Sequence, residues 1–482
     1  MNTPSAEFRQ VMSMSEIDRD RGTRIDECLS VREDHLWIED CDSVELAARF
    51  GTPIYVVSEN QLRRNARHLV QAFSSQWPGP VHVLPSIKAN HVLALRRILS
   101  SEGLGCDTFG RSELWAALTC GVPAELISVN GTGKSAELVE EAVAAGCRIT
   151  LDSSRELDLA IAAARRLGRR AQLRVRVRPD LTALKQVASD FSIEGESITE
   201  VARRYKAGIP MDELLPLGKR ALQADEVDLV GVHVHFGRHT RGLDAWSEMM
   251  HAFGDAVGRL STAWDGWQPR ELDVGGGIPT GRDPTGRAIP RLASDRGLAP
   301  TMEKYAEVIC TSLSESLATN GISSSDKTLE IEPGRACYAD IGVHLSRVVN
   351  VKTESEPAPV RFVELDTTEM FLMDLHLEHN RWSHVVANRA SEAATVVADL
   401  VGMSCGFDTI IPDADLPDVG PGDLVAFLDT GAYQEVTASN FNAMGRPATV
   451  LVLDATARVV RRAETIEDVF RRDIDVTSGE SG

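Results

Sequence analysis

The chain has 482 residues, enough for two or three domains, and its 43% of hydrophobic and 25% of charged residues are ordinary for a globular protein. The formal net charge is −20 at pH 7. Surfaces that bind nucleic acid or anionic lipid need clustered lysine and arginine, so this charge argues against both. We therefore expect neither nucleic acid nor a membrane as a partner.

The cysteines and the chain ends indicate the cellular compartment. The eight cysteines are scattered and form no C-x-x-C pair, which is typical of a reducing compartment and argues against a zinc site. No apolar run has the length of a signal-peptide core or of a membrane-spanning helix. We expect a cytoplasmic protein without a bound metal, with a mobile tail over residues 1–30 and a disordered tail over 471–482.

From about residue 54, short β-branched runs alternate with amphipathic helical stretches, the pattern of parallel strands joined by crossover helices. Eight such runs precede residue 338, and eight parallel strands close a (β/α)8 barrel. The connection over 181–226 is longer than a plain loop, so we expect it to carry one or two helices over the barrel mouth. The predicted strands are 81–87, 105–109, 126–130, 148–152, 172–178, 227–235, 271–274 and 329–332.

After residue 338 the pattern changes to strand-like segments separated by Gly, Pro and Asp turns, such as GVHLSRVVNVKT and ATVLVLDATARVV. The predicted fold class is therefore α/β. It comprises a TIM-like barrel over 57–337 and a C-terminal β-barrel or β-sandwich domain over 338–470, to which the segment 31–56 contributes.

Residues with chemical functions recur at the ends of the predicted barrel strands, where the active sites of such barrels lie. Lys88 ends the first strand in PSIKAN, and Asp107 lies on the second in GCDTFG. His235 ends the sixth strand in GVHVHFGR, and Glu332 ends the eighth in EPGR. The seventh ends in a glycine run: Gly275, Gly276 and Gly277.

Each of these residue types suits an aldehyde cofactor that carries a phosphate. A lysine forms a Schiff base with a carbonyl. Consecutive glycines let backbone N–H groups approach phosphate oxygens, and Arg335 can add a charged contact. A carboxylate such as Glu332 keeps a pyridine ring protonated, which makes the ring an electron sink. Singly, each residue also has a structural explanation, so the prediction depends on their combination.

The segment SVNGTGKS at 128–135 ends like a phosphate-binding P-loop. However, Ser128 occupies the position where the motif requires its first glycine. We therefore do not predict a nucleotide hydrolase.

The motifs and their order resemble the fold-type III pyridoxal-phosphate (PLP) dependent decarboxylases, the family of diaminopimelate and ornithine decarboxylases. The resemblance extends over about residues 50 to 455. The motifs that carry it are SIKAN, GCDTFGRSEL, GVHVHFG, DVGGG, EPGR, KAGIPMDEL, VGMSC, LPDVGPGD, DTGAY and SNFNAMGRP.

This resemblance implies PLP as the cofactor and an amino acid as the small-molecule substrate. It implies that Lys88 is the Schiff-base lysine with Asp107 as its ion-pair partner, that His235 stacks on the cofactor ring, and that Glu332 pairs with the pyridine nitrogen. The residues expected at the phosphate are Gly275, Gly276, Gly277, Gly334, Arg335 and Tyr433.

The resemblance also implies a homodimer with shared active sites. Cys405 would enter the site of the other subunit and return a proton to the carbanion that CO2 leaves behind. Asp408 and Tyr433 would belong to the same interface site. The substrate amine would take the place of Lys88 on the cofactor before the bond to the α-carboxylate breaks.

Several positions depart from the family pattern and concern the substrate. Arg238 and His239 follow GVHVHFG, where the family has a small residue, and the acid that usually follows the cysteine of the Cys405 loop is missing. The stretch that begins at Asp366 lacks the Arg-Pro pair of diaminopimelate decarboxylases, which disfavours diaminopimelate. We hypothesise a substrate with an acidic or conjugated side chain; the alternative is that Arg238 only contacts the phosphate.

Other functions stay open. Asp366 and Asp408 could face a cationic tail, so diaminopimelate, ornithine or arginine is the alternative class of substrate. An amino-acid racemase has the same barrel and lysine, and a non-catalytic relative could bind a protein partner. EPGR and the Cys405 loop favour a decarboxylase over a racemase. Retention of Lys88, Glu332, Arg335 and Cys405 together argues against a non-catalytic relative.

Overall fold

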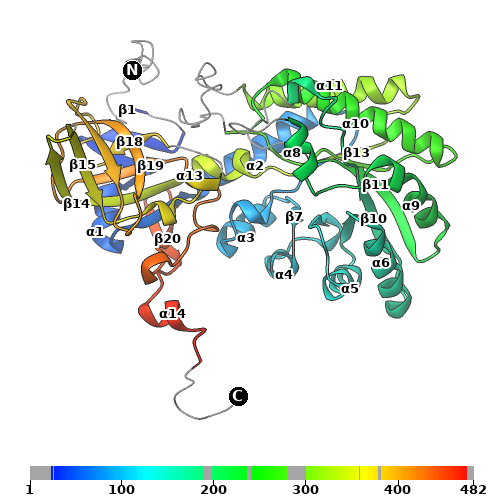
Figure 1. Ribbon diagram of the computed structural model, residues 1–482, viewed down its shortest axis with the longest axis horizontal. Helices are drawn as coiled ribbons and strands as arrows, with labels where there is room; N and C mark the ends of the chain where they lie inside the picture. The colour runs from blue at the N-terminus through cyan, green and yellow to red at the C-terminus, as the bar shows by residue number, and fades with distance from the viewer. Residues whose placement is uncertain are drawn as a thin grey trace. The chain divides into compact units, whose positions relative to one another are not determined.

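The computed structural model describes residues 23–24, 27–187, 198–235, 240–280, 300–357, 359–377 and 382–474 (Figure 1). The chain forms two compact units. The first, called the barrel unit, is Leu62–Asp340; the second, called the β unit, combines Met1–Gln61 with Ile341–Gly482. Most of the two predicted tails lies outside the described residues, as do Arg238 and His239.

The barrel unit is built on eight parallel strands that pair in the order β6-β13-β12-β11-β10-β9-β8-β7. A parallel bridge between Ser86 and Asp107 joins the two ends of this order. Each strand overlaps one predicted run, so the predicted fold class is confirmed. The strands are β6 (Val81–Val83), β7 (Cys106–Thr108), β8 (Ile127–Val129), β9 (Arg148–Leu151), β10 (Ala171–Arg176), β11 (Val227–His233), β12 (Glu271–Asp273) and β13 (Thr328–Ile331).

Helices alternate with these strands and lie outside them (Figure 1). Helix α5 (Ala136–Ala145) shows how the sequence sets their ends: the Ser135 hydroxyl accepts the N–H of Leu138 at the first turn, and Gly146 ends the helix in the left-handed region. The other helices are α2 (Glu59–Ser74), α3 (Leu93–Ser101), α4 (Arg111–Thr119), α6 (Ser154–Leu167), α8 (Ile198–Arg204), α9 (Met211–Gln223), α10 (Leu243–Ala263), α11 (Met302–Thr319) and α12 (Arg335–Tyr338). The long connection after β10 thus carries two described helices.

The lysine of the P-loop-like segment has a structural role. Lys134 is buried, and its ammonium group donates to the carbonyl of Thr150 at 2.6 Å and to Glu156 at 3.0 Å. These contacts connect the loop before α5 to β9 and α6. Because the ammonium group of Lys134 is already paired inside the protein, it is not available to bind a nucleotide phosphate.

The β unit is centred on a sheet in which the N-terminal strand β5 (Ile54–Ser58) lies between β14 (Gly342–Glu354) and β20 (Ala448–Leu453). Segments from the two ends of the chain therefore share one hydrophobic core. The remaining strands of this sheet are β15 (Val360–Leu365), β16 (His384–Val386), β17 (Val396–Val401), β18 (Thr409–Leu416), β19 (Leu424–Leu428) and β21 (Thr456–Arg461).

A second, smaller sheet in the β unit pairs four short antiparallel strands. They are β1 (Thr23–Arg24), β2 (Leu29–Arg32), β3 (His35–Ile38) and β4 (Cys41–Asp42), followed by α1 (Ser43–Phe50). Two short helices, α13 (Asp374–Leu377) and α14 (Ile466–Phe470), complete the described elements of the unit. No helix among the described residues of either unit is both long and apolar enough to cross a membrane.

The barrel interior contains a buried cluster of charges. Arg174 has no exposed surface, pairs with Glu330, and lies 2.9 Å from Asp273. Arg148 pairs with the same Glu330. Burial alone would raise the pKa of Glu330, but the two guanidinium groups lower it well below its ordinary range. The two arginines therefore keep Glu330 ionised, whereas burial and the negative charge of Glu332 raise the pKa of Asp273 well above its ordinary value.

We predict that Arg174→Met destabilises the protein by about 3–5 kcal/mol, because the substitution removes the buried cation that pairs with Glu330 and leaves Arg148 as its remaining partner. Unfolding in urea measures the loss. Arg165→Met is the matched control, because Arg165 pairs with Glu226 at the surface, and we expect a much smaller loss from it. Equal losses in the two variants would contradict the importance of the buried cluster.

Candidate active site

Lys88 and Asp107 form an ion pair at the C-terminal ends of the first two barrel strands. Lys88 lies in a 3-10 turn, Ile87–Ala89, that follows β6, and its Nζ is 3.0 Å from Asp107 Oδ2. Burial alone would raise the pKa of Asp107, but the ammonium group of Lys88 and hydrogen bonds from Ser86 and Asn130 lower it to about 2. The amine is partly exposed while its partner is buried, so the lysine is oriented and still accessible.

Asn130, at the end of β8, links this ion pair to Glu332. Its side-chain amide donates to Asp107 Oδ1 at 2.8 Å and also to Glu332 Oε1, and its own oxygen accepts the hydroxyl of Ser128 at 2.7 Å. The sequence prediction missed Asn130. Its position at the end of the third barrel strand was the available signal.

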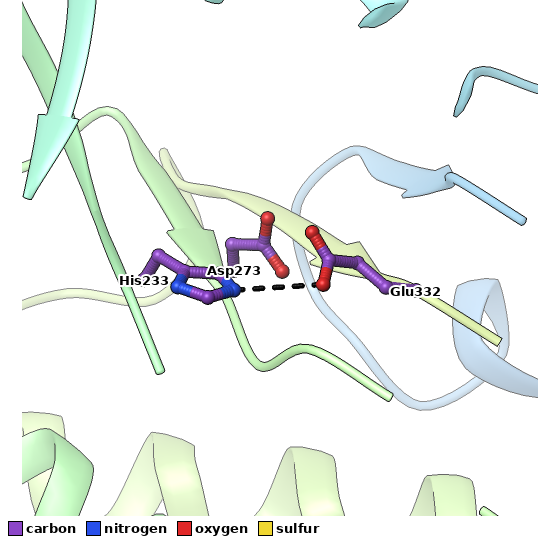
Figure 2. A group of neighbouring side chains, drawn as sticks. All are labelled: His233, Asp273 and Glu332. Carbon is purple, nitrogen blue, oxygen red and sulfur yellow. Dashed lines mark ion pairs between the residues drawn. The ribbon is translucent and has the colours of Figure 1, made fainter. Parts of the chain in front are cut away.

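Glu332 lies among buried polar groups that the sequence prediction also missed. Figure 2 shows Glu332 beside His233 and Asp273. Glu332 Oε2 is 3.5 Å from His233 Nε2 and 3.9 Å from His235 Nδ1. Burial, reinforced by the negative charge of Asp107, raises the pKa of Glu332 to about 7. The carboxyl group therefore lies where a neighbouring cation would favour its charged form.

His235 presents a neutral ring at the barrel mouth. The backbone N–H of Gly276 donates to His235 Nδ1 at 2.9 Å, so this nitrogen carries no proton. Burial and the positive charges of Lys88 and Arg176 lower the pKa of His235 well below its ordinary value. Tyr205, directly after α8, donates its hydroxyl to the carbonyl of His235 at 2.5 Å, and Arg176 donates to the same oxygen at 3.1 Å. The ring is thus fixed in a form that suits stacking on a flat cofactor.

The glycine run after β12 has no room for side chains. Gly275 has φ +69°, and a Cβ there would lie 2.5 Å from His235 Nδ1. A Cβ on Gly276 would lie 2.2 Å from the carbonyl oxygen of Glu332. Gly277 follows with φ +108°, also in the region that favours glycine. These positions therefore require glycine, and the N–H groups of Gly275 and Gly276 donate to Asp273 Oδ1 and His235 Nδ1.

These residues fit PLP. Contacts run without a break from Lys88 through Asp107 and Asn130 to Glu332, and the glycine run contacts His235. The chain thus offers an amine for an aldehyde and a buried carboxylate for a ring nitrogen, with a glycine run that carries no side chains beside them. Gly334 and Arg335, which were predicted at the phosphate, lie at the start of α12. Gly334 directly precedes this helix, and Arg335 is the first residue of the helix and is buried.

The cluster of His233, Asp273 and Glu332 also has the spacing of a metal site, because one ligand atom from each lies within 4.8 Å of the others. Two interactions already use these groups, however. The guanidinium group of Arg174 is 2.9 Å from Asp273 Oδ2, and Asn130 donates to Glu332. The guanidinium group of Arg174 thus already supplies the positive charge that a metal ion would bring to these carboxyl groups.

The other predicted site residues belong to the β unit. Cys405 is exposed, whereas the other seven cysteines are buried. Its backbone N–H donates to Asn442 Oδ1 at 2.9 Å, and Asn442 Nδ2 donates to Cys405 Sγ at 3.3 Å. Tyr433 has φ +64° and is partly buried. The loop therefore presents its thiol outward, in a position held by Asn442.

The two aspartates predicted for the substrate already accept hydrogen bonds within the β unit. Asp408 is buried and accepts the backbone N–H groups of Ser404 and Glu369, both at 2.6 Å. Asp366 accepts the hydroxyl of Thr52 at 2.5 Å and the N–H of Arg347 at 2.8 Å. Both carboxylates thus stabilise turns of the unit, and a substrate contact from either one stays a prediction.

The pKa of Glu332 generates a test on the apoprotein. A carboxyl group with a pKa near 7 in the folded chain, against the ordinary 4.5, keeps its proton in the folded state while the unfolded state ionises. Its contribution to stability therefore falls as the pH rises from 5 to 8. We expect Glu332→Gln to gain up to about 3 kcal/mol relative to the unsubstituted apoprotein over this range.

Denaturant unfolding of the apoprotein at pH 5 and pH 8 measures this gain. Glu307→Gln, at an exposed position of α11, is the matched control for the loss of a carboxylate at the surface. A Glu332→Gln difference that stays constant would contradict the raised pKa.

Comparison with known proteins supports the cofactor prediction. Residues 59–339 match the family model described as the pyridoxal-binding domain of pyridoxal-dependent decarboxylases. Diaminopimelate decarboxylase of Archaeoglobus fulgidus is 30% identical, over 91% of this chain and 96% of its own length. Diaminopimelate decarboxylase of Actinosynnema pretiosum is 31% identical, over 90% and 91%.

Among solved structures, diaminopimelate decarboxylase of M. jannaschii in complex with L-lysine matches with a TM-score of 0.83 at 25% identity, over 94% of this chain and 99% of that one. The family model covers more than half of the chain, and the relatives span both units. The chain therefore belongs to the pyridoxal-dependent decarboxylases and is an enzyme of that family with pyridoxal phosphate as its cofactor.

Proposed function

We propose that the protein is a diaminopimelate decarboxylase, which releases CO2 from diaminopimelate and forms lysine. The main support is the end-to-end similarity to relatives with this name: they match through the barrel unit and the β unit alike, with few residues left over on either side. The similar structure from M. jannaschii was solved with L-lysine bound, which is the expected product.

In the proposed reaction, PLP supplies an electron sink for the bond to the α-carboxylate. Lys88 would hold the cofactor through its amine, which Asp107 keeps oriented. Glu332 would pair with the ring nitrogen, and the neutral ring of His235 would stack on the cofactor. Cys405 returns a proton to the α-carbon, as an exposed thiol on a loop of the β unit.

The relatives support this substrate better than the acidic or conjugated side chain that Arg238 led us to hypothesise. The argument against diaminopimelate depended on a missing Arg-Pro pair after Asp366. Diaminopimelate carries both an ammonium and a carboxylate at its distal end, so it also satisfies the positive charge of Arg238. We infer that Arg238 supplies the contact to the distal carboxylate.

Release of CO2, with the mass of the product, tests the proposal on a panel of diaminopimelate, ornithine, arginine and glutamate. We expect turnover of diaminopimelate and lysine as the product. Arg238→Ser should raise KM for diaminopimelate about tenfold or more while the affinity for PLP stays unchanged. Preference for another member of the panel would contradict the substrate, and α-proton exchange without CO2 would indicate a racemase.

We also propose a homodimer in which each active site takes Cys405 from the partner subunit. Large apolar side chains are exposed around this cysteine: Phe407 is fully exposed, and Met403 is 50% exposed. Phe441, 43% exposed, adjoins Asn442, which holds Cys405. Exposed apolar side chains grouped in this way are typical of a protein–protein interface. We propose a second copy of this chain as the partner, because the family resemblance implies active sites shared between two identical subunits.

Mixing two inactive variants tests the shared site. Lys88→Ala and Cys405→Ala dimers should each have little activity, because each lacks one residue at both sites. After the subunits exchange, a mixed dimer holds one intact site, so equal amounts should recover about a quarter of the unsubstituted activity. Recovery of none, with exchange verified by mass, would mean that Lys88 and Cys405 of one site come from the same chain.

A further inference from the structure

Beneath the cofactor contacts, the barrel holds two buried polar residues, His233 and Asp273, to which the proposed function assigns no role. Both have no exposed surface, and Glu332 beside them is 3% exposed. Figure 2 shows the His233 ring and the Asp273 carboxyl group pointing toward Glu332. The three side chains come from neighbouring strands, β11 and β12, and from the end of β13.

His233 has hydrogen-bonding capacity that the described residues leave unused. Neither of its ring nitrogens has a hydrogen-bond partner among the described residues, and Nε2 lies 3.5 Å from Glu332 Oε2. Burial lowers the pKa of His233 to about 3, so the ring is neutral at physiological pH and carries one proton. A buried polar group without a partner is costly, and Glu332 is the acceptor that its Nε2 faces.

Asp273 anchors this arrangement. Its Oδ1 accepts the N–H of Gly275 at 2.9 Å, and its Oδ2 lies 2.9 Å from the guanidinium group of Arg174. The residue thus connects the glycine run to the buried charge cluster. Asp273 also hydrogen-bonds to Glu332, and His233, with Nε2 3.5 Å from Glu332 Oε2, is the second polar side chain of the group beside this carboxyl group.

The carboxylate of Glu332 faces competing charges. Asp107 is negatively charged, whereas Lys88 and Arg174 are positively charged. Burial and the negative charge of Glu332 raise the pKa of Asp273 well above its ordinary value, so Asp273 does not act as a further negative charge. To hold a protonated ring nitrogen, Glu332 has to be ionised. A neutral donor to one of its oxygens favours the ionised form without adding a competing cation. Asn130 already donates to the other oxygen, Oε1, and Asp273 hydrogen-bonds to the same carboxyl group, so a hydrogen bond from His233 would complete a set of neutral donors around it.

We propose that His233 is a positioning residue that donates a hydrogen bond from Nε2 to Glu332 and so holds its carboxylate, ionised, for the ring nitrogen of PLP. This inference rests on the proposed function, because it assigns Glu332 to the ring nitrogen. It predicts a change in the affinity for PLP that requires the ring nitrogen and that can be measured without turnover.

The dissociation constant of PLP from the apoprotein measures this effect. His233→Leu removes the donor at similar volume and should weaken PLP binding about tenfold. His233→Gln places an amide N–H where Nε2 was and should restore most of the affinity. The 1-deaza analogue of PLP, which has a carbon in place of the ring nitrogen, should bind the unsubstituted protein and His233→Leu with similar affinity.

His344→Leu is the matched control, because His344 is equally buried but belongs to the β unit, where it contacts Thr367. It should leave the ratio of the affinities for PLP and the analogue unchanged. Equal losses for PLP and the analogue in His233→Leu, or no loss at all, would overturn the inference. If the unsubstituted apoprotein binds no PLP, the proposed function fails and the inference with it.

Discussion

The closure of the barrel at Asp107 is the constraint on which the site depends. Strands β6 and β7 are joined by the bridge between Ser86 and Asp107, together with a hydrogen bond from the N–H of Gly105 to the carbonyl of Val83. The same Asp107 carboxylate accepts hydrogen bonds from Ser86 and Asn130 and pairs with Lys88. Because one residue closes the barrel and orients the lysine, the fold and the cofactor site form together.

The barrel interior below this closure is charged, whereas such barrels are usually filled by branched apolar side chains. Arg174 connects Glu330, deep in the barrel, with Asp273, which lies beside Glu332. Removing charges from water is costly, and the cost is offset only where each charge has close partners. In exchange for this cost, the carboxyl group of Glu332 is held in place by fixed dipoles. Little reorganisation of the protein is then needed when a cofactor binds.

The substrate depends on few residues, which explains why the sequence alone led to the less supported class. The missing acid after Cys405 and the missing Arg-Pro pair are local departures, and several arrangements of charge can bind the same distal group. Overall similarity weighs the whole chain and places it among relatives that are named diaminopimelate decarboxylase. Asp408 illustrates the difference: its carboxylate closes its own turn, which the sequence could not show.

The sequence by itself determined the eight strands, because alternating strand and helix patterns are local, and short motifs at strand ends predicted Lys88, Asp107, His235 and Glu332 as site residues. His233 was within reach of the same reasoning, since residues two apart on a strand share a face, and its ring lies parallel to that of His235. Only the tertiary structure decided that Asn130 joins Asp107 to Glu332 and that Asp273 lies against Arg174. These contacts join strands that are distant in sequence, and their geometry depends on how the barrel closes.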